Sequence, residues 1–311
     1  MDRASLFQKP TLHRLKLFLA LSRTPHGLLD LATPGLAALL CLGGFPPLGV
    51  TVLGLITVFA GYTAVYALND VVDYRTDKAK IGEGGLTGEG YLDGVMVRHP
   101  MAQGLLSFKE GLTWALAWAA LALTGAYLLN PVCALFFILG CILEAVYCFM
   151  LEISHWRTLV SGVVKSLGGL AAVFAVNPNP SPLFLILLFL VIFFWEIGGQ
   201  NVPADWHDLE ADRRWHANTV PVRYGLEGSC KIILGSLILA AILLLPLMVA
   251  SPLRFPWWLM ALAMGAGVFL LIIPAVHLCQ NRERSQATVL FNKASYFPSA
   301  VLLITVLALL G

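Results

Sequence analysis

The fold is decided where the apolar run "TVLGLITVFAGYTAVY" at residues 51–66 passes directly into "ALNDVVDYRTDKAK" at residues 67–80. The first run, with its flanks, has the ~20 mostly apolar residues that a helix needs to cross a bilayer. The second run places four polar side chains close together where the chain leaves the membrane: Asn69, Asp70, Asp73 and Asp77. This junction predicts a membrane-spanning helix with an acidic cluster at its end.

The composition of the whole chain also indicates a membrane protein. Of its 311 residues, 58% are hydrophobic and only 12% are charged, whereas a soluble domain carries about 25% charged residues. The net charge of +2 is too small to indicate a nucleic-acid partner. The six cysteines form no C-x-x-C pair, and we interpret them as buried apolar side chains rather than as a metal or disulfide site.

Nine segments are apolar and long enough to span the membrane, so the sequence predicts an all-α, polytopic membrane protein. Proline and glycine mark most of the junctions, as in "GGFPPLG" at 43–49 and "NPNPSP" at 177–182. The predicted spans are 27–44, 48–68, 111–129, 131–151, 158–177, 182–200, 230–250, 256–279 and 290–310.

Charge is distributed unequally between the two sides of the membrane. If the N-terminus is cytoplasmic, every Lys and Arg except Lys165 and Arg254 lies in a cytoplasmic segment or at the cytoplasmic end of a span. No Asp or Glu lies in an outside loop. The positive-inside rule therefore predicts a cytoplasmic N-terminus and an outside C-terminus. The two long cytoplasmic loops, 69–110 and 201–229, are then the expected working side.

The second long loop repeats the acidic pattern of the first. In "GGQNVPADWHDLEADRRWHANTVPVRYG" at 198–225, Asp205, Asp208 and Asp212 have the same D-x2-D-x3-D spacing as the aspartates at 69–77. Each cluster follows an even-numbered span. One cluster alone is equally well explained as a solvated first turn whose acids complement a helix N-terminus. That explanation does not account for two matched copies at equivalent exits from the bilayer.

The spacing also predicts a metal site. Residues i, i+3 and i+7 of a helix lie within ~60° of one another, so each acidic trio is expected to share one helix face. Carboxylates this close stay ionised in a partly desolvated site only when cations lie among them. Oxygen ligands without a nearby Cys or His pair suit Mg²⁺. We expect solvated carboxylates in the metal-free protein. The predicted metal ligands are Asn69, Asp70, Asp73, Asp77, Asp205, Asp208 and Asp212.

Three segments resemble the motifs of a known family. "NDVVDYRTD" at 69–77 resembles the N-D-x-x-D-x-x-x-D motif of the UbiA-type intramembrane prenyltransferases. "DWHDLEADRRWHANTVPVRYG" at 205–225 is similar to their second acidic motif. "YCFMLEISHWRT", which begins at Tyr147, is similar to their fourth-helix tyrosine and the basic loop that follows it.

The resemblance covers nearly the whole chain. It implies one domain, residues 1–311, with nine helices in a bundle around a central cavity and with cytoplasmic cap loops. The chain departs from the family in "VRHPMAQG" at 97–104, where the family has Arg-Pro-x-x-x-G and His99 here follows Arg98. The loop before it, with the glycine-rich "IGEGGLTGEG" at 81–90, is longer than usual.

The resemblance implies Mg²⁺-dependent transfer of a prenyl group from a prenyl diphosphate to a lipophilic, aromatic acceptor such as a quinone precursor. A bundle open to membrane lipid would hold the apolar tail, and the cytoplasmic rim would hold the charged head. With Mg²⁺, the diphosphate becomes a better leaving group. The predicted catalytic residues are Asp73, Asp208 and Tyr147. The side chains predicted to bind the diphosphate are Lys78, Arg98, Lys165 and Arg213.

Other functions stay open on sequence grounds. A membrane terpene cyclase would ionise the same diphosphate and quench the cation internally, and the sequence does not separate it from a transferase. A transporter is less favoured, because its charges typically lie at the midplane of inverted repeats, whereas here the repeat is parallel and the acids lie at the rim. Lys165, inside the fifth span, is either a diphosphate ligand or a structural partner of Glu144 on the preceding span.

Overall fold

The computed structural model describes residues 11–82 and 91–311, which form helices and loops without a strand. Within these residues, nine helical segments are long and apolar enough to cross a membrane. The all-α, polytopic fold predicted from the sequence is therefore confirmed. Two of the basic residues used to predict the orientation, Arg3 and Lys9, lie outside the described residues, as does most of the glycine-rich segment.

The first five spans match the predicted segments within a few residues. The first consists of α2 (Thr24–Asp30) and α3 (Ala32–Leu42), which follow a short helix, α1 (Thr11–Leu21). The loop before the third span contains α5 (Tyr74–Gly82) and a short 3-10 helix, η2 (Leu92–Val95). Spans two to five are α4 (Leu48–Val72), α6 (Phe108–Leu129), α7 (Pro131–Phe149) and α8 (Arg157–Val176).

The sixth, seventh and ninth spans differ more from the prediction, whereas the eighth agrees with it within two residues. The sixth consists of α9 (Pro182–Glu196), a π-helix η3 (Ile197–Asn201) and α10 (Val202–His207), and the seventh is α12 (Val220–Ala250). The eighth consists of α13 (Trp257–Gly267), η4 (Val268–Ile272) and α14 (Ile273–Asn281), and the ninth of α15 (Arg284–Ser295) and α16 (Phe297–Leu310). Helix therefore extends into the expected loop 201–229 from both sides. Between the sixth and seventh spans, the chain contains only α11 (Leu209–Arg214) and short connections. Hydropathy marks the apolar part of a helix and not its end, so the sixth span ends later, and the seventh and ninth spans begin earlier, than predicted.

The starts of several helices have local causes in the sequence. Ser107 and Glu110 form a capping box at the start of α6, in which each side chain accepts a hydrogen bond from the other residue's backbone N–H. The Asn130 side chain accepts a hydrogen bond from the Val132 N–H at the start of α7. Gly225, with φ of 67° and ψ of −177°, kinks α12 near its start, a conformation that favours glycine.

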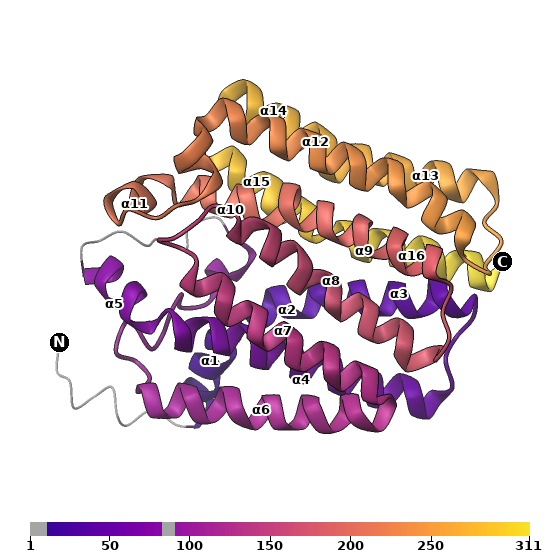
Figure 1. Cartoon of the computed structure of the whole chain (residues 1–311), viewed down its shortest axis with the longest axis horizontal. Helices are drawn as coiled ribbons and strands as arrows, with labels where there is room; N and C mark the ends of the chain where they lie inside the picture. Colours follow the sequence, from indigo (N-terminus) through magenta and orange to yellow (C-terminus); the bar gives the residue numbers. More distant parts are fainter. Residues whose placement is uncertain (1–10, 83–90) are drawn as a thin grey trace.

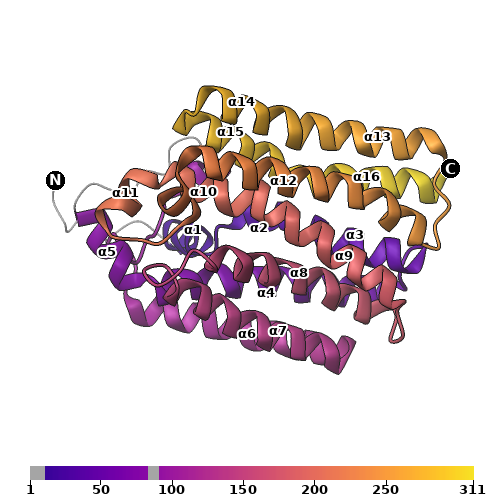
Figure 2. The same ribbon diagram turned by 45° about the horizontal axis from the view of Figure 1, so that its top comes forward.

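The helices run along the long axis of the molecule, and α5, α10 and α11 gather at one end (Figures 1 and 2). The C-terminus lies at the opposite end in both views. The residues that follow the second span and those that end the sixth span therefore meet at the same end of the bundle. This arrangement brings together the two acidic motifs, which are 135 residues apart in the chain.

The apolar core lies on one side of the bundle. It is built mainly from α9, α12 and α15–α16, with side chains such as Leu188, Leu237 and Leu290 fully or almost fully buried. Two glycines of η3 allow the sixth span to pack tightly. A Cβ on Gly198 would lie 2.8 Å from the Ile233 carbonyl oxygen, and one on Gly199 would lie 2.8 Å from the Ala294 Cβ. The other side of the bundle, between α3, α4, α7 and α8, encloses a cavity.

Candidate active site

The cavity has a volume of about 600 Å³ and is divided into a polar and an apolar end. Residues of both acidic motifs line the polar end. The other end is lined by small and apolar residues, among them Gly54, Phe137, Ala171 and Ala175. A cavity divided in this way suits a ligand with a charged head and a long apolar tail.

The two acidic motifs have the same backbone geometry. Asp73 separates α4 from α5, with φ of −83° and ψ of 1°, and Asp208 separates α10 from α11, with φ of −94° and ψ of 8°. Both residues lie in the sparsely populated bridge region of backbone conformations. In each motif, a 2.9 Å hydrogen bond joins the N–H of the last aspartate to the carbonyl oxygen of the middle one. The duplicated spacing in the sequence therefore corresponds to a duplicated local structure.

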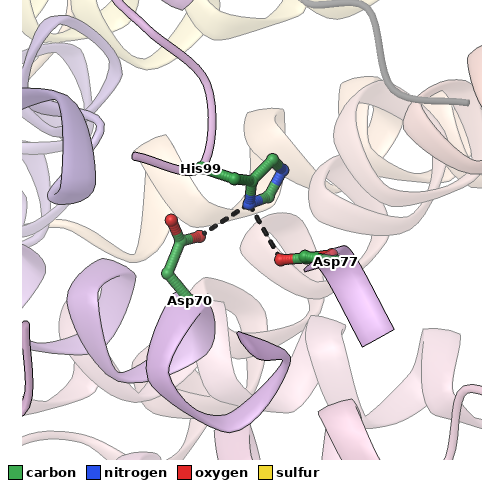
Figure 3. Close-up of side chains that lie close together, drawn as sticks. All are labelled: Asp70, Asp77 and His99. Carbon is green, nitrogen blue, oxygen red and sulfur yellow. Dashed lines mark ion pairs between the residues drawn. The ribbon is translucent and has the colours of Figure 1, made fainter. Parts of the chain in front are cut away.

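A histidine lies between the carboxylates of the first motif (Figure 3). The Nδ1 atom of His99 lies 3.2 Å from Asp70 Oδ1 and 2.9 Å from Asp77 Oδ2. Burial lowers the pKa of this imidazole, but the two carboxylates raise it more, and the net effect raises the pKa of His99 to about 9. The ring is therefore charged at neutral pH. Sequence reasoning gave His99 no role, although its insertion after Arg98 was a visible departure from the family motif.

A second basic side chain, Arg23, also contacts the first motif. Arg23 Nη2 lies 3.3 Å from Asp70 Oδ1 and 3.1 Å from Asn69 Oδ1. Asp70 thus faces two basic side chains and does not line the cavity, whereas Asn69, Asp73 and Asp77 do. The expectation that all three aspartates of the first motif present one face to the site is therefore corrected. Arg23 and His99, which themselves line the cavity, hold Asp70 behind the wall.

Asp73 is the aspartate of the first motif that has no ion pair among the described residues. Burial and the charge of Asp77 raise its pKa to about 6, although Arg157 and Arg23 act in the opposite direction. At neutral pH, the Asp73 and Asp77 carboxylates therefore repel each other across the cavity wall. A cation bound between them would remove this repulsion.

The second motif is held by an arginine and a tyrosine. Arg157 Nη1 donates a hydrogen bond of 3.1 Å to Asp205 Oδ1, and both side chains are buried. The guanidinium lies 3.9 Å from the centre of the Tyr147 ring, and Asn201 Nδ2 donates a hydrogen bond of 2.9 Å to the Tyr147 hydroxyl. Arg157 and Asn201 line the cavity but were not among the predicted site residues, since a basic residue at a membrane surface is usually an anchor.

The other two carboxylates of the second motif also have partners. Arg98 Nη2 lies 3.2 Å from Asp208 Oδ2, and its guanidinium lies 5.5 Å from the centre of the Tyr91 ring. Thr219 donates a hydrogen bond of 3.3 Å to Asp212 Oδ2. The departure from the family motif thus leaves Arg98 at the cavity wall beside the second acidic motif.

The expectation of solvated carboxylates was wrong for four of the six aspartates. Their residues are at least nine-tenths buried: Asp70, Asp77, Asp205 and Asp212. The physical reason is that basic and hydroxyl side chains surround them and replace water as hydrogen-bond donors. Asp73 and Asp208 are partly exposed.

Two residues predicted to bind diphosphate lie away from the cavity wall. Lys78 is exposed and its Nζ lies 5.7 Å from the centre of the Tyr74 ring. Arg213 is also exposed. Each directly follows an aspartate that faces inward, and one step along a helix turns a side chain by ~100°. A diphosphate role for Lys78 and Arg213 stays a prediction that this geometry does not favour.

Lys165 has a different partner from the predicted one. Its Nζ lies 2.6 Å from Asp30 Oδ2 on α2, whereas Glu144 accepts a hydrogen bond of 2.8 Å from Asn69 Nδ2. The pair with Glu144, one of the two alternatives left open by the sequence, is therefore wrong. Both acids lie inside the bundle near the same rim, and the sequence does not show which helix faces α8. Lys165 also lines the cavity.

Replacing Lys165 by Met is expected to lower the free energy of unfolding by about 3–5 kcal/mol, the usual effect of removing one partner of a buried ion pair. The measurement is unfolding of the purified protein in mixed micelles titrated with sodium dodecyl sulfate. The double variant Lys165→Met with Asp30→Asn is expected to recover most of the loss. Full recovery with Glu144→Gln instead would contradict the assignment.

The donor set at the polar end fits a hard divalent cation. Five carboxylates and the Asn69 amide line this end of the cavity, and the buried Asn201 Oδ1 lies there without a hydrogen-bond partner. Carboxylate and amide oxygens are the ligands that Mg²⁺ prefers in proteins.

Comparison with known sequences agrees with the geometry. Residues 31–297 match the UbiA prenyltransferase family. A digeranylgeranylglyceryl phosphate synthase of Thermococcus sibiricus is 25% identical over 218 residues, which cover 70% of this chain and 72% of that protein. A 4-hydroxybenzoate octaprenyltransferase of Shewanella woodyi is 28% identical over 194 residues, which cover 61% of this chain and 63% of that protein.

A solved structure shows the same fold. The UbiA homolog from Archaeoglobus fulgidus bound to GPP and Mg²⁺ has a TM-score of 0.67 and 16% identity, covering 93% of this chain and 99% of that one. The family match spans most of the chain and includes both acidic motifs. The protein therefore belongs to the UbiA prenyltransferase family and is a multi-pass membrane prenyltransferase.

Proposed function

We propose that this protein transfers a prenyl group from a prenyl diphosphate to a lipophilic, aromatic acceptor, and that the reaction depends on Mg²⁺. The observation that carries the proposal is the meeting of two acidic motifs with matching backbone geometry at the polar end of one largely apolar cavity. The apolar end suits the prenyl tail. The whole chain, residues 1–311, would act as a single membrane-embedded domain.

The residues that would hold Mg²⁺ come from both motifs. They are the cavity-lining Asn69, Asp73, Asp77, Asp205, Asp208 and Asp212, with Asp70 behind them. Bound there, Mg²⁺ would neutralise the diphosphate and stabilise it as a leaving group. We propose that Asp73 and Asp208 contribute most to Mg²⁺ binding. Each is the middle carboxylate of its motif, lines the cavity and is partly exposed.

The chain itself supplies positive charge to the same place. Arg98 and Arg157 line the polar end, and in the described structure they pair with Asp208 and Asp205. With these carboxylates serving as ligands of Mg²⁺, the two guanidinium groups would be able to bind the diphosphate oxygens. Departure of the diphosphate leaves an allylic cation, which must be kept from water. Tyr147, which contacts Arg157 and Asn201, forms part of the cavity wall near the polar end.

The choice of an aromatic acceptor rests on the cavity wall. Tyr62, Tyr66, Phe136 and Phe291 line the cavity, and the rings of Tyr62 and Tyr66 stack with centroids 6.3 Å apart. Flat aromatic surfaces of this kind pack well against a ring. The names of the two relatives differ in the acceptor that they indicate. One relative is a 4-hydroxybenzoate octaprenyltransferase, and the other is a digeranylgeranylglyceryl phosphate synthase.

The test is to incubate the purified protein in detergent with Mg²⁺, radiolabelled prenyl diphosphates of several lengths, and a panel of aromatic and glyceryl acceptors. The proposal predicts label on an aromatic acceptor and release of diphosphate. A cyclic hydrocarbon formed without acceptor would identify a terpene cyclase instead. Absence of both product and diphosphate release with every substrate would contradict the proposal.

We also propose that the N-terminus and the polar end of the cavity face the cytoplasm and that the C-terminus is outside. The bias of basic residues supports this orientation. Lys109 and Asn179 are exposed at opposite ends of the bundle. In intact cells, a membrane-impermeant maleimide is expected to label Asn179→Cys and to label Lys109→Cys only after lysis. The reverse pattern would overturn the orientation.

A further inference from the structure

A second polar cluster lies deeper in the cavity than the acidic motifs. Tyr62 on α4, Ser161 and Lys165 on α8, and Glu196 on α9 all line the cavity. Ser161 and Lys165 follow Arg157 by one and two helical turns, so they lie ~6 Å and ~12 Å further along α8. The cluster is therefore placed below the expected diphosphate, near the depth that the first carbons of a prenyl chain would reach.

Lys165 is fixed and neutralised from behind the cavity wall. Asp30, which does not line the cavity, accepts hydrogen bonds from Lys165 Nζ at 2.6 Å and from the Tyr66 hydroxyl. The ammonium lies 5.5 Å from the centre of the Tyr62 ring and 5.6 Å from that of the Trp195 ring. Asp30 thus accounts for the charge of Lys165, and Glu196 is not needed to balance it.

One carboxylate oxygen of Glu196 has no hydrogen-bond partner among the described residues. Ser161 Oγ donates a hydrogen bond of 2.8 Å to Glu196 Oε1, but Oε2 is buried without a hydrogen-bond partner. The Tyr62 hydroxyl is also buried without a partner. Buried polar atoms are nearly always hydrogen-bonded, because leaving them unsatisfied is costly. In this cluster, Glu196 Oε2 is therefore an unused acceptor and the Tyr62 hydroxyl an unused donor. A purely structural pair between helices explains Lys165 and Asp30, but not these two atoms.

We propose that Glu196 and Tyr62 bind the hydroxyl group of the acceptor and that Glu196 takes its proton during transfer. A hydroxyl donates one hydrogen bond and accepts others, which matches a carboxylate oxygen and a tyrosine hydroxyl that both line the cavity. This inference rests on the proposed prenyl transfer and specifies its acceptor as a hydroxylated molecule, either a phenol or a lipid alcohol.

The acceptor O–H proton moves to Glu196 Oε2, the acceptor nucleophile forms a bond to the first carbon of the prenyl chain, and the bond from that carbon to the diphosphate breaks. The electron pair of the broken bond leaves on the diphosphate. In a lipid alcohol the nucleophile is the oxygen itself. In a phenol it is a ring carbon, which then loses its own proton while the oxygen regains one.

The first test uses matched ligands with the unmodified protein, Mg²⁺ and a labelled prenyl diphosphate. The acceptors are 4-hydroxybenzoate and 4-methoxybenzoate, 1-naphthol and 1-methoxynaphthalene, and a dialkylglycerol and its methyl ether. The inference predicts product only from hydroxylated members, and the member that reacts distinguishes a phenol from a lipid alcohol. Equal product from a methyl ether, or no product from any hydroxylated acceptor while the prenyl diphosphate still binds, would overturn it. Failure to bind the prenyl diphosphate at all would instead count against the proposed function.

The second test uses Glu196→Gln, with Glu227→Gln as the matched control because Glu227 is exposed on α12. Glu196→Gln is expected to lower kcat for acceptor prenylation at least ~10²-fold, the usual contribution of a positioned base. The Kd of the prenyl diphosphate should stay within about twofold of the unmodified value. Glu196→Asp should restore part of kcat. Unchanged kcat in Glu196→Gln would contradict the role.

Tyr62→Phe provides an independent readout if Glu196→Gln does not fold. It removes only the hydroxyl, so the acceptor KM should rise ~10-fold, as expected for the loss of one hydrogen bond. The Kd of the prenyl diphosphate should not change. An acceptor KM equal to that of the unmodified protein would remove Tyr62 from the site and would overturn the two-residue binding proposed here.

Discussion

Asp208→Asn and Asp73→Asn are each expected to lower kcat at least ~10²-fold, because losing one element of a preorganised electrostatic site typically has that effect. Both residues occupy the middle position of their motifs and line the polar end of the cavity. Both are partly exposed, so the substitutions should leave the unfolding free energy within about 1 kcal/mol of the unmodified value. Steady-state prenyl transfer at saturating Mg²⁺, together with detergent unfolding, provides both numbers.

Glu210→Gln is the matched control for this pair. Glu210 is exposed on α11, between Asp208 and Asp212 in the chain, and its substitution should leave kcat within about twofold of the unmodified value. If Asp208→Asn or Asp73→Asn behaved like Glu210→Gln, the corresponding motif would have no part in the reaction.

Arg157→Met is expected to damage both stability and activity, and a second substitution should separate the two effects. The change leaves Asp205 buried without its guanidinium partner, which should lower the free energy of unfolding by about 3–5 kcal/mol. It also removes a positive charge from the polar end of the cavity, so kcat/KM for the prenyl diphosphate should fall at least ~10²-fold. Both quantities are measured on protein purified at low temperature.

The double variant Arg157→Met with Asp205→Asn removes both charges. Most of the lost stability should return, since no unpaired charge remains buried, whereas activity should stay low because Mg²⁺ and the diphosphate have each lost a ligand. Recovery of activity together with stability would show that Arg157 only holds Asp205 in place. Failure to recover stability would show that the pair is not the main role of Arg157.

The fold could be predicted from the sequence because it depends on features that are local in the chain. Each span is a continuous apolar run, and the repeat of three aspartates follows from spacing alone. The structure adds that Asp73 and Asp208 share one backbone conformation. What hydropathy missed was the extent of the sixth and seventh spans. Both α10 and the start of α12 are helical but carry polar residues: Asp205 of α10 lines the cavity, and Arg223 and Glu227 of α12 are exposed.

Contacts between helices were harder to predict because they depend on rotation about each helix axis. Asp30 and Glu144 are both acids within the bundle, and only the structure shows that Lys165 contacts Asp30. Arg157 and Arg23 were not predicted as site residues, because many basic residues lie on the same side of the membrane. The sequence does not show which of these side chains turn toward the cavity. His99 shows the opposite case, because the departure from the family motif was visible but its meaning required the positions of Asp70 and Asp77.

The central claim is that both acidic motifs together bind Mg²⁺ and the prenyl diphosphate. Isothermal titration of the purified protein with a non-hydrolysable prenyl diphosphate analogue, in Mg²⁺ and in EDTA, tests it most directly. The account predicts tight binding in Mg²⁺, loss of at least ~10-fold in affinity in EDTA, and a similar loss in Mg²⁺ for Asp73→Asn and for Asp208→Asn. Equal affinity in Mg²⁺ and EDTA, or full affinity in either variant, would contradict it.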